Sequence, residues 1–210
     1  MKKILISIRP EWVVKILNGE KTIEIRKTAP KCELPCEVYI YCTKENRYDE
    51  LLVYNKDQKV AVLNKSRAFY LDDIKRFPHL QKLNGKVVAK FTLNKVHEIN
   101  KDLVGDEEYE SYKERCYESR EIKEAELLKL SCLDYLDLRF YLDPHDYPKR
   151  GKVGYAWHID KLVIFDKPKE LEEFEFPNPS GIRYIGQRAI KGLPSKKRPP
   201  QSWCYVEVSE

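Results

Sequence analysis

Apolar and polar residues alternate at the start of the chain and then change period. Residues 4–9 alternate with the period of a strand, and Pro10 suits the first position of a helix. Apolar side chains between residues 12 and 17 then recur at helical spacing. Gly19 favours the end of that helix, because glycine accepts the left-handed conformation that closes it. Alternation resumes over 22–26, so the opening pattern predicts a strand, a short helix and a strand.

The rest of the chain supplies further strands and two short helices. Strands are predicted at 38–42, 59–63, 86–93 (continuing towards Val96), 154–165 and 203–208. Helices are predicted at 121–130 and at about 134–142. Asp134 suits the N-cap of the second helix, because an acidic residue follows it three positions later. Residues 98–124 are acidic and poor in large aliphatic side chains, which predicts a solvated loop and helix with little part in the core. Together these elements predict an α+β fold with a largely antiparallel sheet or barrel.

The domain organisation follows from what interrupts this pattern. The chain contains no internal repeat, and nothing between its segments resembles a flexible linker. The regular pattern weakens between residues 46 and 84, which predicts an insert. An acidic helical segment is predicted at about 98–142. We therefore expect one domain over residues 1–210 that carries a variable insert and this acidic segment.

Composition excludes several classes of protein. The 210 residues are 42% apolar and 35% charged, with 39 basic against 34 acidic side chains and a net charge of +5. A chain of this length can bury a sizeable core without disulfide bridges. No apolar run approaches the length of a membrane span, and the six largely apolar residues after Lys3 are too few for a signal peptide. The composition favours a cytoplasmic globular protein with reduced cysteines and no membrane contact, and the mild positive charge permits an anionic partner.

Candidate chemistry is concentrated after the first predicted helix. If Ile23 and Ile25 face the core, then Thr22, Glu24 and Arg26 share the opposite face of their strand. The tight turn at Gly19 leaves Lys21 at the mouth of that strand, and Arg9 joins the group if the first two strands pair. Such a group suits a nucleotide, since Arg and Lys bind phosphate or a carbonyl and Glu accepts from an exocyclic amine. The alternative is a solvated strand face whose surface salt bridge contributes less than about 1 kcal/mol.

These residues also resemble a known family. Residues 8–11 together with 16–26 resemble the hallmark of ASCH domains, whose motif Gly-x-Lys-x-x-Glu-x-Arg is matched from Gly19 to Arg26. Softer matches to the longer phage and bacterial members lie at 38–44, 85–91, 156–171 and 198–203. The resemblance implies a PUA-like β-barrel with the Lys21–Arg26 segment lining a cleft, and a protein that binds RNA or a nucleotide.

One branch of that family has a similar motif and implies an alternative function. Its members are amidohydrolases that act on acetylated cytidine through a lysine, a threonine and a glutamate. The lysine maps onto Lys21, whereas the position of the threonine is occupied by Glu24, and Thr22 lies two residues earlier. If hydrolysis occurs here, Glu24 would act as the general base and Lys21 or Arg26 would stabilise the oxyanion. The alternative therefore is a small hydrolase of N4-acetylcytidine-type nucleosides.

Isolated cysteine, histidine and tryptophan residues give weaker signals. Cys32, Cys36 and Cys42 lack the paired spacing of a structural zinc site, so we expect thiols rather than metal ligands. Trp157 falls on one face of its predicted strand and favours the core, whereas His158 falls on the other. A role in the cleft, as a donor or a stacking group, suits His158. No metal and no cofactor are predicted.

A basic segment near the C-terminus is the second candidate for contact with nucleic acid. No acidic residue occurs between Glu175 and Glu207, and six cations fall within the sixteen residues from 183 to 198. They are Arg183, Arg188, Lys191, Lys196, Lys197 and Arg198. This segment predicts contact with a phosphate backbone, unless residues 98–124 pack against it and neutralise it. A third hypothesis is a protein partner that binds through the insert or the acidic segment.

Overall fold

The computed structural model divides the chain into two interwoven compact units. It describes residues 3–44, 51–64, 74, 76–104, 114–118, 121–143, 151–176, 182–185, 188–191 and 198–208. The first unit comprises Met1–Pro10, Glu37–Lys90 and Val163–Glu210, and the second comprises Glu11–Cys36 and Phe91–Leu162. Neither unit is a continuous piece of sequence, and the expectation of a single domain stays a prediction.

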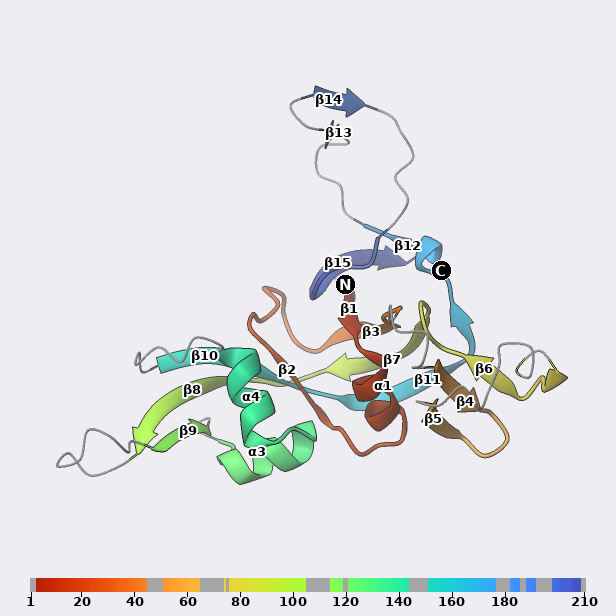
Figure 1. The fold of residues 1–210 in the computed structure, drawn as a ribbon. Helices are drawn as coiled ribbons and strands as arrows, with labels where there is room; N and C mark the ends of the chain where they lie inside the picture. The colour runs from red at the N-terminus through yellow and green to blue at the C-terminus, as the bar shows by residue number, and fades with distance from the viewer. Residues whose placement is uncertain are drawn as a thin grey trace. The chain divides into compact units, whose positions relative to one another are not determined.

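A six-stranded sheet forms the centre of the first unit, in the order β11-β7-β3-β1-β15-β12 (Figure 1). Its strands are β1 (Lys3–Ile8), β3 (Cys36–Cys42), β7 (Val87–Leu93), β11 (Asp160–Lys169), β12 (Phe174–Glu175) and β15 (Trp203–Val208). Strand β1 pairs parallel with β3 and antiparallel with β15. A short 3₁₀ helix at Leu171–Glu173 contributes Leu171 to a core cluster that also contains Tyr39 and Phe174. The predicted strands at 38–42, 86–93 and 203–208 are thereby confirmed.

A separate small sheet forms within the 46–84 region. Strand β4 (Leu51–Asn55) lies between β5 (Val60–Asn64) and β6 (Leu80–Lys82), and both pairings are antiparallel. The side chain of Leu52 is fully buried, and its backbone N–H donates to the side-chain oxygen of Asn84. The strand predicted at 59–63 is confirmed. The other two strands of this sheet, β4 and β6, were not predicted from the sequence.

The second unit is built on an antiparallel sheet in the order β2-β10-β8-β9. The strands are β2 (Ile23–Arg26), β8 (Val96–Val104), β9 (Glu114–Glu118) and β10 (Gly151–His158). Helices α3 (Glu124–Ser131) and α4 (Tyr135–Leu142) pack against one face of this sheet (Figure 1). Their buried residues join those of the strands in one cluster: Ile23, Ile25, Ile99, Tyr117, Ile122, Leu127, Leu138, Leu142 and Ala156.

Local sequence signals account for the ends of the helices. Helix α1 (Pro10–Leu17) is followed by Gly19 with φ of 76°, the left-handed conformation expected there. Asp134 caps α4 as predicted, because its carboxylate accepts from the backbone N–H of Asp137 at 2.7 Å. Among the described residues no helix is long and apolar enough to cross a membrane. Mixed sheets with short helices confirm the α+β class.

The prediction for residues 98–124 is wrong. Much of this segment forms strands β8 and β9 rather than a solvated loop and helix, and the helical part begins only at Glu124. Three alternate residues of β8 are buried, namely His97, Ile99 and Lys101. Two of these three inward positions carry polar side chains, so the strand lacks the apolar alternation by which it could be recognised. Lys101 forms an ion pair with Asp143 that compensates its burial.

Candidate functional site

The register between β2 and β10 defines two faces of the sheet around the motif. Glu24 pairs with Trp157 and Arg26 with Tyr155, which places these four residues on one face. Ile23 and Ile25 lie on the other face, within the core cluster covered by α3 and α4. The predicted division is therefore confirmed for Ile23 and Ile25 against Glu24 and Arg26, whereas Thr22 lies before the strand.

A row of ion pairs joins the three charged residues of the motif. Lys21 Nζ lies 3.3 Å from Glu24 Oε2, and Arg26 Nη2 lies 3.0 Å from Glu24 Oε1. The carboxylate thus lies between two cations, one on each oxygen. Lys21 is only 2% exposed, and Glu24 and Arg26 are each 7% exposed. The alternative of a solvated strand face with a surface salt bridge is wrong, because both faces of β2 are buried.

The ammonium of Lys21 also caps a helix that lies far away in the sequence. Its Nζ donates to the carbonyl of Ser131 at 2.7 Å. Ser131 is the last residue of α3, where carbonyls lack partners within the helix and carry partial negative charge. The indole of Trp12 is the third neighbour, with its ring centre 5.4 Å from Nζ. Burial lowers the pKa of Lys21, and the Glu24 carboxylate opposes this shift without cancelling it.

Backbone contacts fix the position of Lys21. The N–H groups of Glu20 and Lys21 both donate to the carbonyl of Lys15, which closes the end of α1. The N–H of Thr22 donates to the carbonyl of Leu130 in α3 at 2.9 Å. The segment between α1 and β2 is therefore held against the C-terminal end of α3. This arrangement presents Lys21 to Ser131 and Glu24 together.

Arg26 has an aromatic neighbour on α4. Burial raises the pKa of Tyr141, and the neighbouring positive charge of Arg26 opposes this shift without cancelling it. Lys27 Nζ lies 5.5 Å from the centre of the same ring. Tyr141 is 38% exposed, so the outer end of the ion-pair row meets an accessible aromatic side chain. This end of the row combines a guanidinium, an ammonium and a phenol.

Sequence reasoning missed four residues of this site: Trp12, Ser131, Tyr141 and Trp157. Only Trp157 had a signal in the sequence, because strand alternation places it on the face opposite to His158. The face that it shares with Glu24 becomes known only from the pairing of β10 with β2. The contact of Lys21 with Ser131 spans 110 positions of sequence. A contact of that range follows from the topology of the sheet and not from local spacing.

Two other predicted members of the cluster, Thr22 and Arg9, are exposed. Thr22 follows the turn and is exposed. Arg9 was expected to join the group if the first two strands paired, and that pairing does not occur. Strand β1 lies between β3 and β15, whereas β2 pairs with β10. Arg9 is exposed and belongs to the first unit, so its part in ligand binding stays a prediction.

His158 does not join the cluster. It pairs with Ile23 on the helix-covered face of the sheet, opposite to the face of Glu24 and Arg26. Its ring centre lies 4.8 Å from that of His97 on β8. The predicted role of His158 as a donor or stacking group in the motif's cleft is wrong, because successive residues of a strand point to opposite faces.

The basic segment is described only in part. Arg183 lies in β13 (Ile182–Ile185), which pairs antiparallel with β14 (Arg188–Lys191), whose first residue is Arg188. Arg198 is exposed. Lys196 and Lys197 lie outside the described residues. Contact of this segment with nucleic acid stays a prediction.

Five cysteines are free thiols, namely Cys32, Cys36, Cys42, Cys132 and Cys204. Cys32 Sγ lies 3.7 Å from Cys36 Sγ, and burial together with this neighbour raises the pKa of Cys36 to about 12. Such a thiol is a poor nucleophile at neutral pH, because the thiolate is the reactive form. In the part of the chain with described side chains, no group of three or more His, Cys, Asp or Glu residues is placed to hold a metal ion.

Comparisons with known proteins find similar solved structures but no similar sequence. No family model and no curated protein matches the sequence. The crystal structure of ASCH from Zymomonas mobilis matches with a TM-score of 0.41 and 14% identity, over 98% of this chain and 88% of that chain. A mutant of the same protein matches with a TM-score of 0.43 and 15% identity, over 99% of this chain and 91% of the other. Both are ASCH proteins. The chain is thus similar to solved members of the family whose motif it resembles.

Proposed function

We propose that this chain is an ASCH-type, PUA-like protein that binds a nucleoside or a short RNA at the row of Lys21, Glu24 and Arg26. The observation that carries the proposal is the burial of these three charges in one connected row. Taking an ion out of water costs several kcal/mol even in a real protein, and ion pairing offsets this cost only in part. Buried charge clusters are characteristic of functional sites, as is a lysine whose pKa burial lowers, here Lys21.

The chemistry of the row suits the polar edge of a base and its phosphate. Arg26 and Lys27 supply donors for a carbonyl or a phosphate oxygen, and Glu24 supplies an acceptor for an exocyclic amine. Trp12 is half-buried beside Lys21, and Tyr141 is accessible beside Arg26. Aromatic faces next to cations favour stacking with a base, which is worth about 1–3 kcal/mol per base. We assign contact with the ligand to Glu24 and Arg26, and the positioning of Glu24 to Lys21.

Hydrolysis of an N4-acetylated cytidine is the second candidate. It would use Glu24 as a general base and Lys21 or Arg26 for the oxyanion. Both cations already contact Glu24, and Lys21 also donates to the Ser131 carbonyl. Burial lowers the pKa of Lys21, which suits a lysine that exchanges a proton. Because its cations are engaged with the proposed base, the row favours binding over catalysis.

Removal of a cation from the row is expected to weaken ligand binding. The test measures thermal stability and calorimetric binding with cytidine, N4-acetylcytidine, cytidine monophosphate and short single-stranded RNAs. We expect one of these ligands to bind, and its affinity to fall at least tenfold in Arg26→Gln and in Lys21→Met, since a charged hydrogen bond contributes about 1.5–3 kcal/mol. Release of acetate from N4-acetylcytidine, measured in the same samples, tests the hydrolytic candidate.

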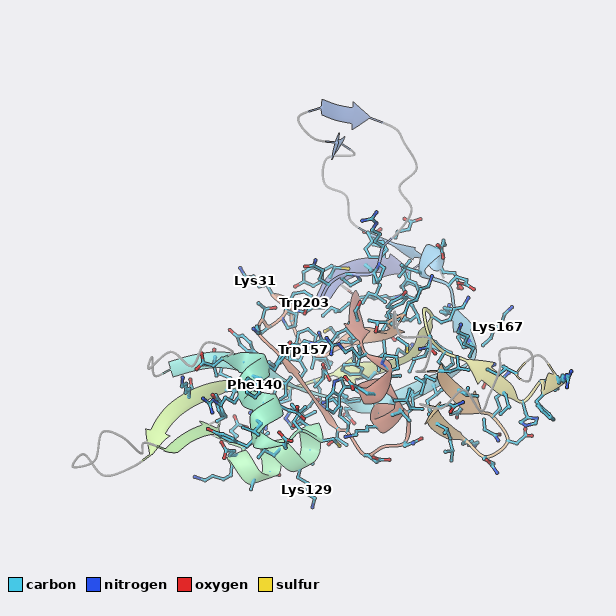
Figure 2. The ribbon with its side chains drawn as sticks, viewed as in Figure 1. Lys31, Lys129, Phe140, Trp157, Lys167 and Trp203 are labelled. Atoms are coloured by element: carbon cyan, nitrogen blue, oxygen red, sulfur yellow. The ribbon has the colours of Figure 1, made fainter. Side chains whose placement is uncertain are left out.

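A matched control separates the row from the general charge of the protein. Lys129, labelled in Figure 2, is an exposed lysine on α3, and Lys129→Met removes the same charge without touching the row. Its affinity for the ligand should equal that of the wild type. Binding that is equally strong in Arg26→Gln and the wild type, or no binding to any ligand of the panel, would reject the proposed site.

The basic segment should make RNA binding depend on salt. Each phosphate contact to a single strand contributes about 0.7 to the slope of log K against log salt concentration. Replacing Lys196, Lys197 and Arg198 together by glutamine is expected to reduce this slope by about 2. The measurement is fluorescence anisotropy of a labelled RNA over a range of salt concentrations.

The control for this experiment removes three exposed lysines from other places. Lys59, Lys82 and Lys123 are exposed and lie outside the basic segment. Their replacement by glutamine should leave the slope unchanged. An equal slope in both triple variants and the wild type would show that residues 196–198 make no phosphate contact.

A further inference from the structure

Helix α4 carries a group of exposed apolar side chains, among them Phe140, which is labelled in Figure 2. Leu136 is 53% exposed, Phe140 62% and Tyr141 38%. They are three of the eight large hydrophobic side chains that are exposed in the described part of the chain. The opposite face of α4 is buried in the core of the second unit through Leu138 and Leu142. Because exposed apolar side chains gathered in one place mark interaction sites, the outer face of α4 indicates a binding surface.

Cations border the C-terminal end of this face. Lys27 is exposed, and its Nζ lies 5.5 Å from the centre of the Tyr141 ring. Arg26 and Glu24 act on the Tyr141 phenol with opposite charge, and the effect of Arg26 is the larger. Glu24 itself is paired with the two cations of the row. Tyr141 therefore joins the ion-pair row to the exposed face of α4.

The charges of α4 itself are arranged in the same sense. Its basic residue, Arg139, lies in the last turn next to Phe140, and its acidic residue, Asp137, lies in the first turn. Asp143, which follows the helix, forms an ion pair with Lys101. An anionic ligand is therefore favoured at the end of α4 that carries Phe140.

The size of this surface decides between two classes of partner. A fully buried aromatic side chain covers about 150–250 Å², so the exposed parts of the three side chains amount to roughly 300 Å². A stable interface between two copies of a chain buries about 800 Å² on each copy. The surface is too small by itself for such a dimer, whereas a single base needs only one ring on which to stack. Single-stranded RNA combines flat bases with a charged backbone, which matches aromatic rings bordered by cations.

We propose that Phe140 is a stacking platform for single-stranded RNA, and that it takes the base next to the one bound at the ion-pair row. Tyr141 lies between the two positions, and Lys27 and Arg139 supply positive charge for the phosphates on either side. Leu136 lies one turn from Phe140 and extends the apolar surface. The inference rests on the proposed function and narrows it, because a ligand that also occupies the platform is an RNA of two or more nucleotides and not a free nucleoside.

The test compares a nucleotide with an oligonucleotide on the full chain. Calorimetry measures the affinity for each of the common ribonucleoside monophosphates, and fluorescence anisotropy measures the affinity for a labelled single-stranded hexanucleotide RNA of mixed sequence. In Phe140→Ala we expect the affinity for the hexanucleotide to fall about fivefold or more, the effect of removing one stacked base. The affinity for the monophosphate that binds best should not change. Phe140 is exposed, so the variant should fold like the wild type.

Two further substitutions at the same position separate stacking from simple apolar contact. Phe140→Leu keeps an apolar side chain without a ring and should lose as much RNA affinity as Phe140→Ala, whereas Phe140→Trp keeps a ring and should bind like the wild type. Phe77→Ala is the matched control, because it makes the same change at a phenylalanine of the first unit that is 47% exposed. Its affinity for the hexanucleotide should equal that of the wild type.

The platform and the ion-pair row can fail separately. If Arg26→Gln weakens the binding of both ligands while Phe140→Ala binds the hexanucleotide as tightly as the wild type, the platform is rejected and the row stands. No binding of the hexanucleotide by the wild type, or an equal loss of affinity in Phe77→Ala, would also reject the platform. Dimers of the wild type that disappear in Phe140→Ala, measured by sedimentation, would assign the face to a second copy of the chain and overturn the inference.

Discussion

Replacing Glu24 with alanine is expected to lower the free energy of unfolding by about 3–5 kcal/mol. The carboxylate lies between Lys21 and Arg26, and all three residues are at least nine-tenths buried. The variant would leave two cations close together in a region of low dielectric without the negative charge between them. The loss of one partner of a buried ion pair is far more damaging than the loss of a surface pair. Urea denaturation of the purified variant measures the effect.

Two comparisons separate this mechanism from a general loss of contacts. Glu33→Ala removes an exposed carboxylate from the same unit and should change stability by less than about 0.5 kcal/mol. Adding Lys21→Met to Glu24→Ala should recover part of the lost stability, because only one of the two cations then remains without a negative partner. If Glu24→Ala lost less than about 1 kcal/mol, the value typical of an exposed pair, the row would be solvated.

A fully apolar version of the row separates stability from function. The triple variant Lys21→Met, Glu24→Leu, Arg26→Met keeps similar side-chain volumes and removes all three charges. Replacement of a buried ion-pair network by apolar residues is often neutral or stabilising. The triple variant is therefore expected to resist urea at least as well as the wild type.

Local patterns predicted the elements around the motif well. The alternation in 22–26, the helix before it and the glycine between them lie close together in sequence, and each is governed by short-range backbone preferences. The N-cap at Asp134 is a signal of the same kind. Where the rule depends on a few neighbouring residues, the sequence contains all the information needed.

The burial of both faces of β2 could not be predicted in this way. Alternating apolar and polar residues normally indicate a strand with one solvated face. Here the polar face is buried as well, with Trp157 beside Glu24 in the neighbouring strand. Which strand pairs with β2 depends on topology, and the two strands are separated by more than a hundred residues. The ion-pair row therefore was predicted as a set of residues, but its burial was not.

Strand β8 was not predicted, because polar residues occupy most of its buried positions. Its inward residues include His97 and Lys101, which have polar partners in Glu121 and Asp143. A polar residue at a buried position is recognised only when its partner is known, and both partners come from distant segments. The acidic character of the region therefore predicted solvent exposure where the structure has an internal strand.

Replacing Trp157 with alanine is the second change with a large expected effect, a loss of about 3–5 kcal/mol in the free energy of unfolding. The indole is fully buried, and its residue pairs with Glu24 in β2. Truncation to a methyl group removes a large apolar surface from the core and leaves a cavity that the rigid sheet cannot fill. Water entering that cavity would also reach the ion-pair row. Urea denaturation followed by circular dichroism measures the loss without depending on tryptophan fluorescence.

The matched control is Trp203→Ala, which makes the same change at a partly buried position of β15 in the first unit (both residues are labelled in Figure 2). Because less surface is removed from the core there, its effect should be smaller than that of Trp157→Ala. Trp157→Phe should recover much of the stability, since a benzyl group fills most of the space of the indole. Equal losses at Trp157 and Trp203, or no recovery with phenylalanine, would contradict the packing role.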